Sequence, residues 1–105
     1  MTPEANFRAV AAALENHQGV SMGKMMSSPG IQYNDKNFAF FYKDEMVFKL
    51  GRDWNPEEDG IREWKHLSPF KNKAPLYDWF CITADDADLW QNLAMKALSR
   101  MNAGK

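Results

Sequence analysis

Residues and patterns that would commit this 105-residue chain to a particular chemistry or compartment are scarce. Cys81 is the only cysteine, so no intrachain disulfide can form and nothing requires an oxidising compartment. No apolar run approaches the roughly 20 residues that span a bilayer. The first residues also lack the basic and apolar stretches of a signal peptide. These absences predict a cytoplasmic protein without a membrane partner.

An excess of one charge is missing as well. Thirteen basic and fourteen acidic side chains give a net charge of -1, whereas domains that bind phosphate backbones are usually strongly basic. The best nucleic-acid candidate is the stretch 65–79, which mixes lysines such as Lys71 with Phe70, Tyr77 and Trp79. Lysines in a connecting segment are more often solvated than bound to a ligand. We therefore expect no nucleic-acid partner.

Recognisable catalytic and metal-binding patterns are also absent from the sequence. His17 and His66 are far apart, and neither has a second ligand at a known metal spacing. Cys81 lies between Phe80 and Ile82 in a predicted strand, where an apolar environment raises the pKa of a thiol and makes it unreactive. No serine occupies the strand-to-helix elbow of a hydrolase. We expect no metal and no cofactor, and we favour a role that is not enzymatic.

The composition is that of a globular domain. Hydrophobic residues make up 45% of the chain and charged residues 26%, and a chain of this length has room for one core. The four tryptophans and seven phenylalanines can stabilise such a core without a disulfide or a metal. We predict a single domain over residues 1–105.

Amphipathic segments at both ends predict two helices. In the first, Thr2 is the expected N-cap, Pro3 takes the first helical position, and the helix should end near His17. In the last, Thr83 and Asp86 are expected to form a capping box, which explains the acidic residues there without acid–base catalysis. The apolar stripes of the two helices consist of Phe7, Val10, Ala11 and Leu14, and of Leu89, Trp90, Leu93, Ala94, Ala97, Leu98 and Met101.

Between these segments the pattern changes from helical to alternating. Residues 20–50, with turn residues at 28–30, 34–37 and 43–45, predict an antiparallel meander. Residues 51–66 look irregular, with a short helical turn after Asn55, and a further strand is predicted over residues 77–82. The expected fold class is therefore α+β, with an antiparallel sheet (the meander plus the later strand) packed by N- and C-terminal helices.

The two faces of the predicted meander differ in an unusual way. Ala39, Phe41 and Val47 are expected to point away from the core, to a face that water would normally make polar. Either a later segment covers this face, or the face is a contact surface for a partner or ligand. The expected core face consists of Phe38, Phe40, Tyr42, Met46, Phe48 and Leu50.

A series of short motifs runs from about residue 19 to the end of the chain: Lys24-Met25, Pro29-Gly30-Ile31, Phe38-Ala39, Phe48-Lys49-Leu50 and Leu76-Tyr77-Asp78-Trp79. In their order, and with a final amphipathic helix, they resemble the N-terminal domain of the TfoX/Sxy family, which is related in fold to YjbR-like proteins. The resemblance implies helices flanking a curved antiparallel sheet of the secretion-chaperone-like class. It also implies an association with competence regulation, and it carries over no catalytic residue.

The first functional hypothesis is a small intracellular binding or regulatory module. It would hold a protein partner, or a second copy of itself, on the unusual sheet face. Phe41 and Val47 would supply apolar area, and Lys24 and Lys49 would orient an anionic group. For Lys49, a side chain that reaches past apolar neighbours into water is the simpler alternative.

The second hypothesis is a pocket for a small molecule, or an enzymatic site, between the sheet and the segment around Tyr77 and Trp79. Aromatic side chains and a lysine would converge there, which is the usual composition of a small-molecule site. Co-purification of a small ligand would favour this pocket, and a dimer would favour the module.

Overall fold

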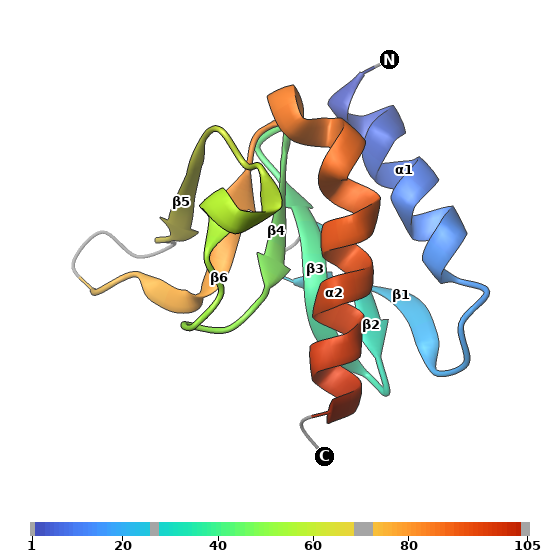
Figure 1. Cartoon of the computed structure of the whole chain (residues 1–105). Coiled ribbons are helices and arrows are strands. Elements are labelled where there is room, and N and C mark those ends of the chain that lie inside the picture. Colours follow the sequence, from blue (N-terminus) through green and yellow to red (C-terminus); the bar gives the residue numbers. More distant parts are fainter. Residues whose placement is uncertain (1, 26–27, 69–72, 104–105) are drawn as a thin grey trace.

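The computed structural model describes residues 2–25, 28–68 and 73–103 of the chain. Two helices at the ends of the chain pack against a six-stranded antiparallel sheet (Figure 1). The strand order is β1-β2-β3-β4-β6-β5, so the sheet follows the chain up to β4, and β6 then lies between β4 and β5. This arrangement confirms the predicted α+β fold, with N- and C-terminal helices on an antiparallel sheet.

The elements have the following bounds. The helices are α1 (Pro3–Leu14) and α2 (Trp90–Ala103), and the strands are β1 (Val20–Met25), β2 (Ser28–Tyr33), β3 (Lys36–Tyr42), β4 (Glu45–Lys49), β5 (Trp64–Leu67) and β6 (Leu76–Ile82). Two short 3₁₀ helices, η1 (Pro56–Asp59) and η2 (Ala84–Leu89), precede β5 and α2 respectively. No helix in the described ranges is long and apolar enough to cross a membrane.

Helix α1 begins as the sequence predicts. Thr2 Oγ1 accepts a hydrogen bond from Ala5 N at 3.1 Å, and Pro3 occupies the first helical position. The helix ends at Leu14 rather than near His17, because the chain turns directly after it, with His17 N donating to Leu14 O at 3.0 Å. Gly19, with a φ of +89°, then leads into β1. The predicted apolar positions of α1 are all buried.

Two hairpins of the meander close on the turns that the sequence predicts. Asn34 and Asp35, and then Lys43 and Asp44, all have φ between 50° and 68°, the geometry of two-residue type I′ turns. The turn predicted at residues 28–30 is wrong, because these residues form the first half of β2 and pair with β1. Pro29 fits there because it lies just beyond the part of β2 that pairs with β3.

The predicted core face of the meander is wrong in part. Because the β3–β4 turn has two residues, Phe40 pairs with Val47, and Tyr42 pairs with Glu45. Directly paired residues point to the same face of a sheet, so Phe40 and Tyr42 share a face with Val47, and not with Phe48 as predicted. Ala39 and Phe41 correspondingly lie on the helix-covered face.

A β-bulge explains why Phe38 is nevertheless in the main core. Ile31 pairs with Ala39, whereas the next residue of β2, Gln32, pairs with Asn37, so Phe38 is left without a partner in the ladder. Its side chain is fully buried in the cluster beneath the helices. The bulge therefore moves one aromatic side chain to the helix face without ending the strand.

Both faces of the sheet carry buried apolar side chains. On the helix face, Phe7 of α1 stacks on Phe41 at 5.3 Å between ring centroids, and Trp90 of α2 is fully buried. The opposite face has its own cluster, formed by Phe40, Val47, Leu67 and Cys81 with Tyr42 and Trp79 packed against it. Of the residues expected to form an exposed apolar face, Val47 is buried in this second cluster, whereas Ala39 and Phe41 belong to the helix-side core.

The start of the last helix differs from the predicted capping box. Thr83 makes no side-chain cap, and the chain forms η2, with a kink at Asp86, before α2 begins at Trp90. The carboxylate of Asp86 accepts hydrogen bonds from Arg62 N and Nε, each at 3.0 Å, and so does not cap the helix. Residues 64–67 form strand β5, which corrects the expectation that residues 51–66 are irregular.

Candidate functional site

A cleft of about 410 Å³ opens at one end of the sheet. It lies where the β2–β3 turn, the end of β4 and the last turns of α2 meet, and Figure 1 shows that turn beside the C-terminal end of α2. Its lining includes three cationic residues, Lys36, Lys49 and Arg100, and one acidic residue, Asp78. We call this space the cationic cleft.

The ends of three elements position these cations. Lys36 is the first residue of β3, directly after a type I′ turn, and Lys49 is the last residue of β4. Arg100 lies in the last turn of α2. Tyr33 and Met101 add carbon surface to the lining. The cleft therefore depends on the tertiary fold and combines residues that are far apart in the sequence.

The absence of a side chain at Gly51 makes room for the guanidinium group of Arg100. Its φ of +88° is left-handed, and a Cβ atom there would lie 2.6 Å from Arg100 Nη1. The amide groups of Leu50 and Gly51 both donate to Asp78 O, at 2.9 and 3.1 Å, which attaches this backbone to β6. The left-handed backbone conformation at residue 51 therefore favours glycine, and the absence of a side chain gives the Arg100 guanidinium room to pack there.

The cations of the cleft are only partly neutralised. Arg100 Nη1 donates to Asp53 Oδ1 at 3.0 Å, and this hydrogen bond lowers the pKa of Asp53. Asp78 lies 3.8 Å from Arg52 Nε, measured to its Oδ1. Within the part of the chain that the structure describes, Lys36 and Lys49 form no salt bridge. The cleft therefore has an excess of positive charge.

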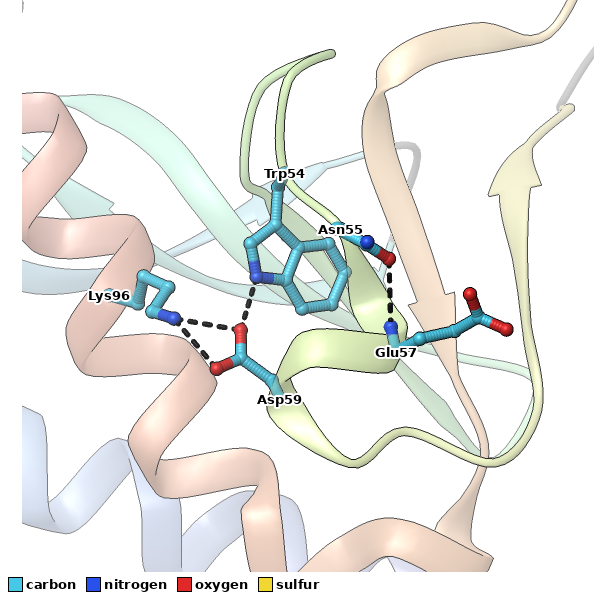
Figure 2. A network of polar contacts seen from close by, with 5 residues as sticks. All are labelled: Trp54, Asn55, Glu57, Asp59 and Lys96. Atoms are coloured by element: carbon cyan, nitrogen blue, oxygen red, sulfur yellow. Dashed lines mark hydrogen bonds and ion pairs between the residues drawn. The ribbon is translucent and has the colours of Figure 1, made fainter.

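A second ion pair holds the same loop against α2. Lys96 Nζ donates to both oxygens of Asp59, at 2.9 and 2.7 Å, and the indole Nε1 of Trp54 donates to the same carboxylate (Figure 2). The hydrogen bond from Lys96 lowers the pKa of Asp59. The loop 51–61 is thus attached to α2 through Asp53–Arg100 and Asp59–Lys96, which we call the two α2 ion pairs.

A separate surface feature lies on β5 and β6. The imidazole of His66 packs between Trp64 and Tyr77, with centroid distances of 5.2 and 5.1 Å. Trp64 is 38% exposed and Tyr77 is 41% exposed. The guanidinium of Arg52 lies 5.4 Å from the centre of the Tyr77 ring. We call Trp64, His66 and Tyr77 the aromatic row.

The structure places the six predicted binding residues in different surroundings. Lys49 lines the cationic cleft, whereas Lys24 is exposed on the edge strand β1. Phe41 is partly buried beneath α1, and Val47 is fully buried in the second cluster. Neither the proposed sheet surface nor a site that includes all six residues is formed.

The two aromatic residues predicted to share a pocket contact different neighbours. Tyr77 belongs to the aromatic row, whereas the ring of Trp79 lies 5.6 Å from that of Phe40 in the second cluster. Of the proposed nucleic-acid stretch, Phe70 and Lys71 lie outside the described residues. No group of three or more His, Cys, Asp or Glu side chains among the described residues is placed to hold a metal ion.

No family model, curated protein or solved structure matches the chain. The resemblance to the TfoX/Sxy family therefore stays a prediction, and no residue role comes to the cleft from a relative. Lys36, Asp78 and Arg100 were not predicted as site residues. A signal was present only in part: Gly51 follows the predicted end of the meander at residue 50, but nothing in the local sequence connects that strand end to Arg100.

Proposed function

We propose that this chain is a binding module that takes a small anionic molecule in the cationic cleft. The observation that carries the proposal is the lining of the cleft, in which three cationic residues and one acidic residue surround about 410 Å³. Ligand pockets commonly measure about 300–1,000 Å³ and combine apolar surface with a few convergent polar groups. A cytoplasmic location, as the sequence predicts, is part of the proposal.

Electrostatics favours an anion over a neutral or cationic ligand. Lys36, Lys49 and Arg100 come from three different elements, and their like charges repel one another when the cleft holds only water. An anion would relieve that repulsion and accept charge-assisted hydrogen bonds from the ammonium and guanidinium groups. Binding would thus be strongest at low salt.

The proposal keeps the predicted binding role but moves its location. Lys49, expected to orient an anionic group beside an apolar sheet face, would do so inside the cleft. Phe41 and Val47 would contribute through packing alone, since both lie in the hydrophobic clusters. No catalytic step is proposed.

Calorimetric titration with inorganic phosphate at low ionic strength tests the proposal. Lys36→Gln and Lys49→Gln should each weaken binding about tenfold, because each removes a charge-assisted hydrogen bond. Lys24→Gln is the matched control, since it removes an exposed lysine on β1 that does not line the cleft. Equal effects of all three substitutions, or no binding to the unmodified protein, would contradict the proposal.

A second candidate function, self-association, is favoured by the aromatic row together with the neighbouring Leu76. Trp64, Leu76 and Tyr77 are large hydrophobic side chains with 37–41% of their surface exposed on the last two strands of the sheet. Sedimentation equilibrium over a wide concentration range would detect a dimer. The dimer should dissociate in Trp64→Ser and persist in Met22→Ser, which removes an exposed hydrophobic residue from the opposite edge strand. A monomer at all concentrations would rule this function out.

A further inference from the structure

We infer that the ligand of the cationic cleft is a phosphate monoester, and that it binds by taking Arg100 away from Asp53. This inference rests on the function proposed above and goes further, because it names the class of ligand and the contact that must break. Four observations carry it: the charge balance of the cleft, the geometry of Arg100, the exposure of Asp53 and the carbon surface of the lining.

The charge balance favours a doubly charged anion. Once Arg100 has left Asp53, the three cationic residues and the one acidic residue of the lining leave an excess of two positive charges. A phosphate monoester carries about 1.5 to 2 negative charges at neutral pH, whereas a carboxylate or a sulfate ester carries one. The monoester is therefore the better match.

Arg100 is the group best suited to such an anion. A guanidinium presents its donors in a planar fork that matches two phosphate oxygens. With Asp53 it makes a single hydrogen bond, from Nη1 at 3.0 Å, and the same side chain lines the cleft. The contact with Asp53 thus holds Arg100 at the cleft while it uses only one of the guanidinium nitrogens.

Asp53 is a weak competitor for Arg100. Its side chain is 81% exposed, and that of Arg100 is 40% exposed, so water screens the ion pair. A phosphate inside the cleft would be less solvated and would also contact Lys36 and Lys49. The exchange of Asp53 for phosphate is therefore favourable once the ligand enters.

The lining also selects an ester over the free ion. Tyr33 and Met101 provide carbon surface beside the cations, and inorganic phosphate would leave that surface uncovered. An apolar substituent on the phosphate would cover it. Inorganic phosphate, which has the phosphate group but no apolar substituent, is thus expected to bind in the cleft. The monoester is expected to bind more tightly.

The exchange has a local consequence for the loop 51–61. Asp53 would lose its contact with α2, while the Asp59–Lys96 pair and the hydrogen bond from Trp54 would remain (Figure 2). Trp54 also packs against Phe80 at 4.8 Å between ring centroids. The release should therefore be confined to residues 51–53.

The test compares phenyl phosphate with phenyl sulfate, which has a similar shape and one negative charge. Calorimetry at pH 7.5 should give about tenfold tighter binding of phenyl phosphate, because phosphate carries nearly one charge more. Affinity for phenyl phosphate should also fall below about pH 6, where the ester takes up a proton. Equal affinities for the two esters would overturn the inference and leave the proposed anion site intact.

Two variants test the exchange of Arg100. Asp53→Asn removes the competitor and should raise the affinity for phenyl phosphate at least about threefold over Glu57→Gln. Glu57 is the matched control, since it is an exposed carboxylate of the same loop whose side chain points away from Lys96 (Figure 2). Equal affinities of the two variants would overturn the inference. Absence of any binding by the unmodified protein and by both variants would overturn the proposed function with it.

Discussion

The carboxylate of Asp86 joins two segments that are distant in the sequence. Its side chain is 3% exposed and accepts from the backbone N and the Nε of Arg62, while Arg62 Nη2 donates to Asp85 O at 2.5 Å. The hydrogen bond with Asp86 raises the pKa of Arg62. The loop before β5 is thereby attached to the start of η2.

Removal of this carboxylate should destabilise the fold. Asp86→Ala leaves a backbone N–H without its partner in a part-buried position, and we expect a loss of about 2 kcal/mol in the free energy of unfolding. Urea denaturation followed by circular dichroism measures it. Asp88→Ala, at an exposed position of the same 3₁₀ helix, should change stability by less than about 0.5 kcal/mol. Equal losses would contradict a specific role for Asp86.

Cys81 should be unreactive in the native protein. Burial raises the pKa of its thiol to about 11, so at pH 8 only about one molecule in a thousand carries the reactive thiolate. A chromogenic disulfide reagent should therefore label the native protein very slowly, and one thiol per chain rapidly in concentrated urea. Comparable rates in both conditions would show that Cys81 is accessible in the fold.

At the scale of elements, the loop 51–61 should respond to acid. Asp53 and Asp59 have pKa values lowered below 3.8 by Arg100 and Lys96. A lowered folded-state pKa means that the stabilisation is complete above the unfolded value of about 3.9 and is lost as the pH falls through the lowered values. The protection factors of the amides in this loop, which correct for the pH dependence of intrinsic exchange, should thus fall below about pH 4.

A double substitution provides the control for this acid response. In Asp53→Asn/Asp59→Asn the two α2 ion pairs are absent at every pH, so the loop should exchange quickly throughout and show no step near pH 4. If the variant also lost protection near pH 4, other carboxylates would be responsible for the acid response.

The elements that could be predicted from the sequence are those with strong local signals, such as capping residues and turn-forming residues. Helix α1 and the turns at Asn34–Asp35 and Lys43–Asp44 have local chemistry that needs no tertiary partner, and all were predicted. Strand β5 has four residues, two of them polar, and depends on β6 for its pairing. The segment 28–30 contains turn-forming residues, yet pairing with β1 overrides that preference.

The candidate site was less predictable than the fold for a related reason. Lys49 was identified from its place on a predicted strand, whereas Lys36 and Arg100 belong to other elements whose ends meet only in the folded chain. The faces of β3 were assigned wrongly because alternation alone does not give the register between two strands. That register follows from the number of turn residues, which fixes Phe40 opposite Val47.

On the scale of the whole molecule, the two hydrophobic clusters share one sheet and should unfold together. Val47 and Phe48 are neighbours on β4 that face the second cluster and the helix-side core respectively. Val47→Ala should cost about 2 kcal/mol, and Phe48→Ala about 3–5 kcal/mol. Both variants should retain the same denaturant slope, with coincident transitions in circular dichroism and tryptophan fluorescence. Two separate transitions in Val47→Ala would show that the second cluster is an independent unit.

The two-residue turn between β3 and β4 also constrains how this protein can change its length during evolution. One inserted residue there would exchange Phe48 and Lys49 between the two sides of the sheet, burying a charge and withdrawing a cation from the cleft. Insertions into this hairpin that preserve the fold should therefore add two residues at a time, or be accompanied by a compensating bulge elsewhere in the strand. The spacing of the hairpin is therefore coupled to the placement of Lys49 at the cleft.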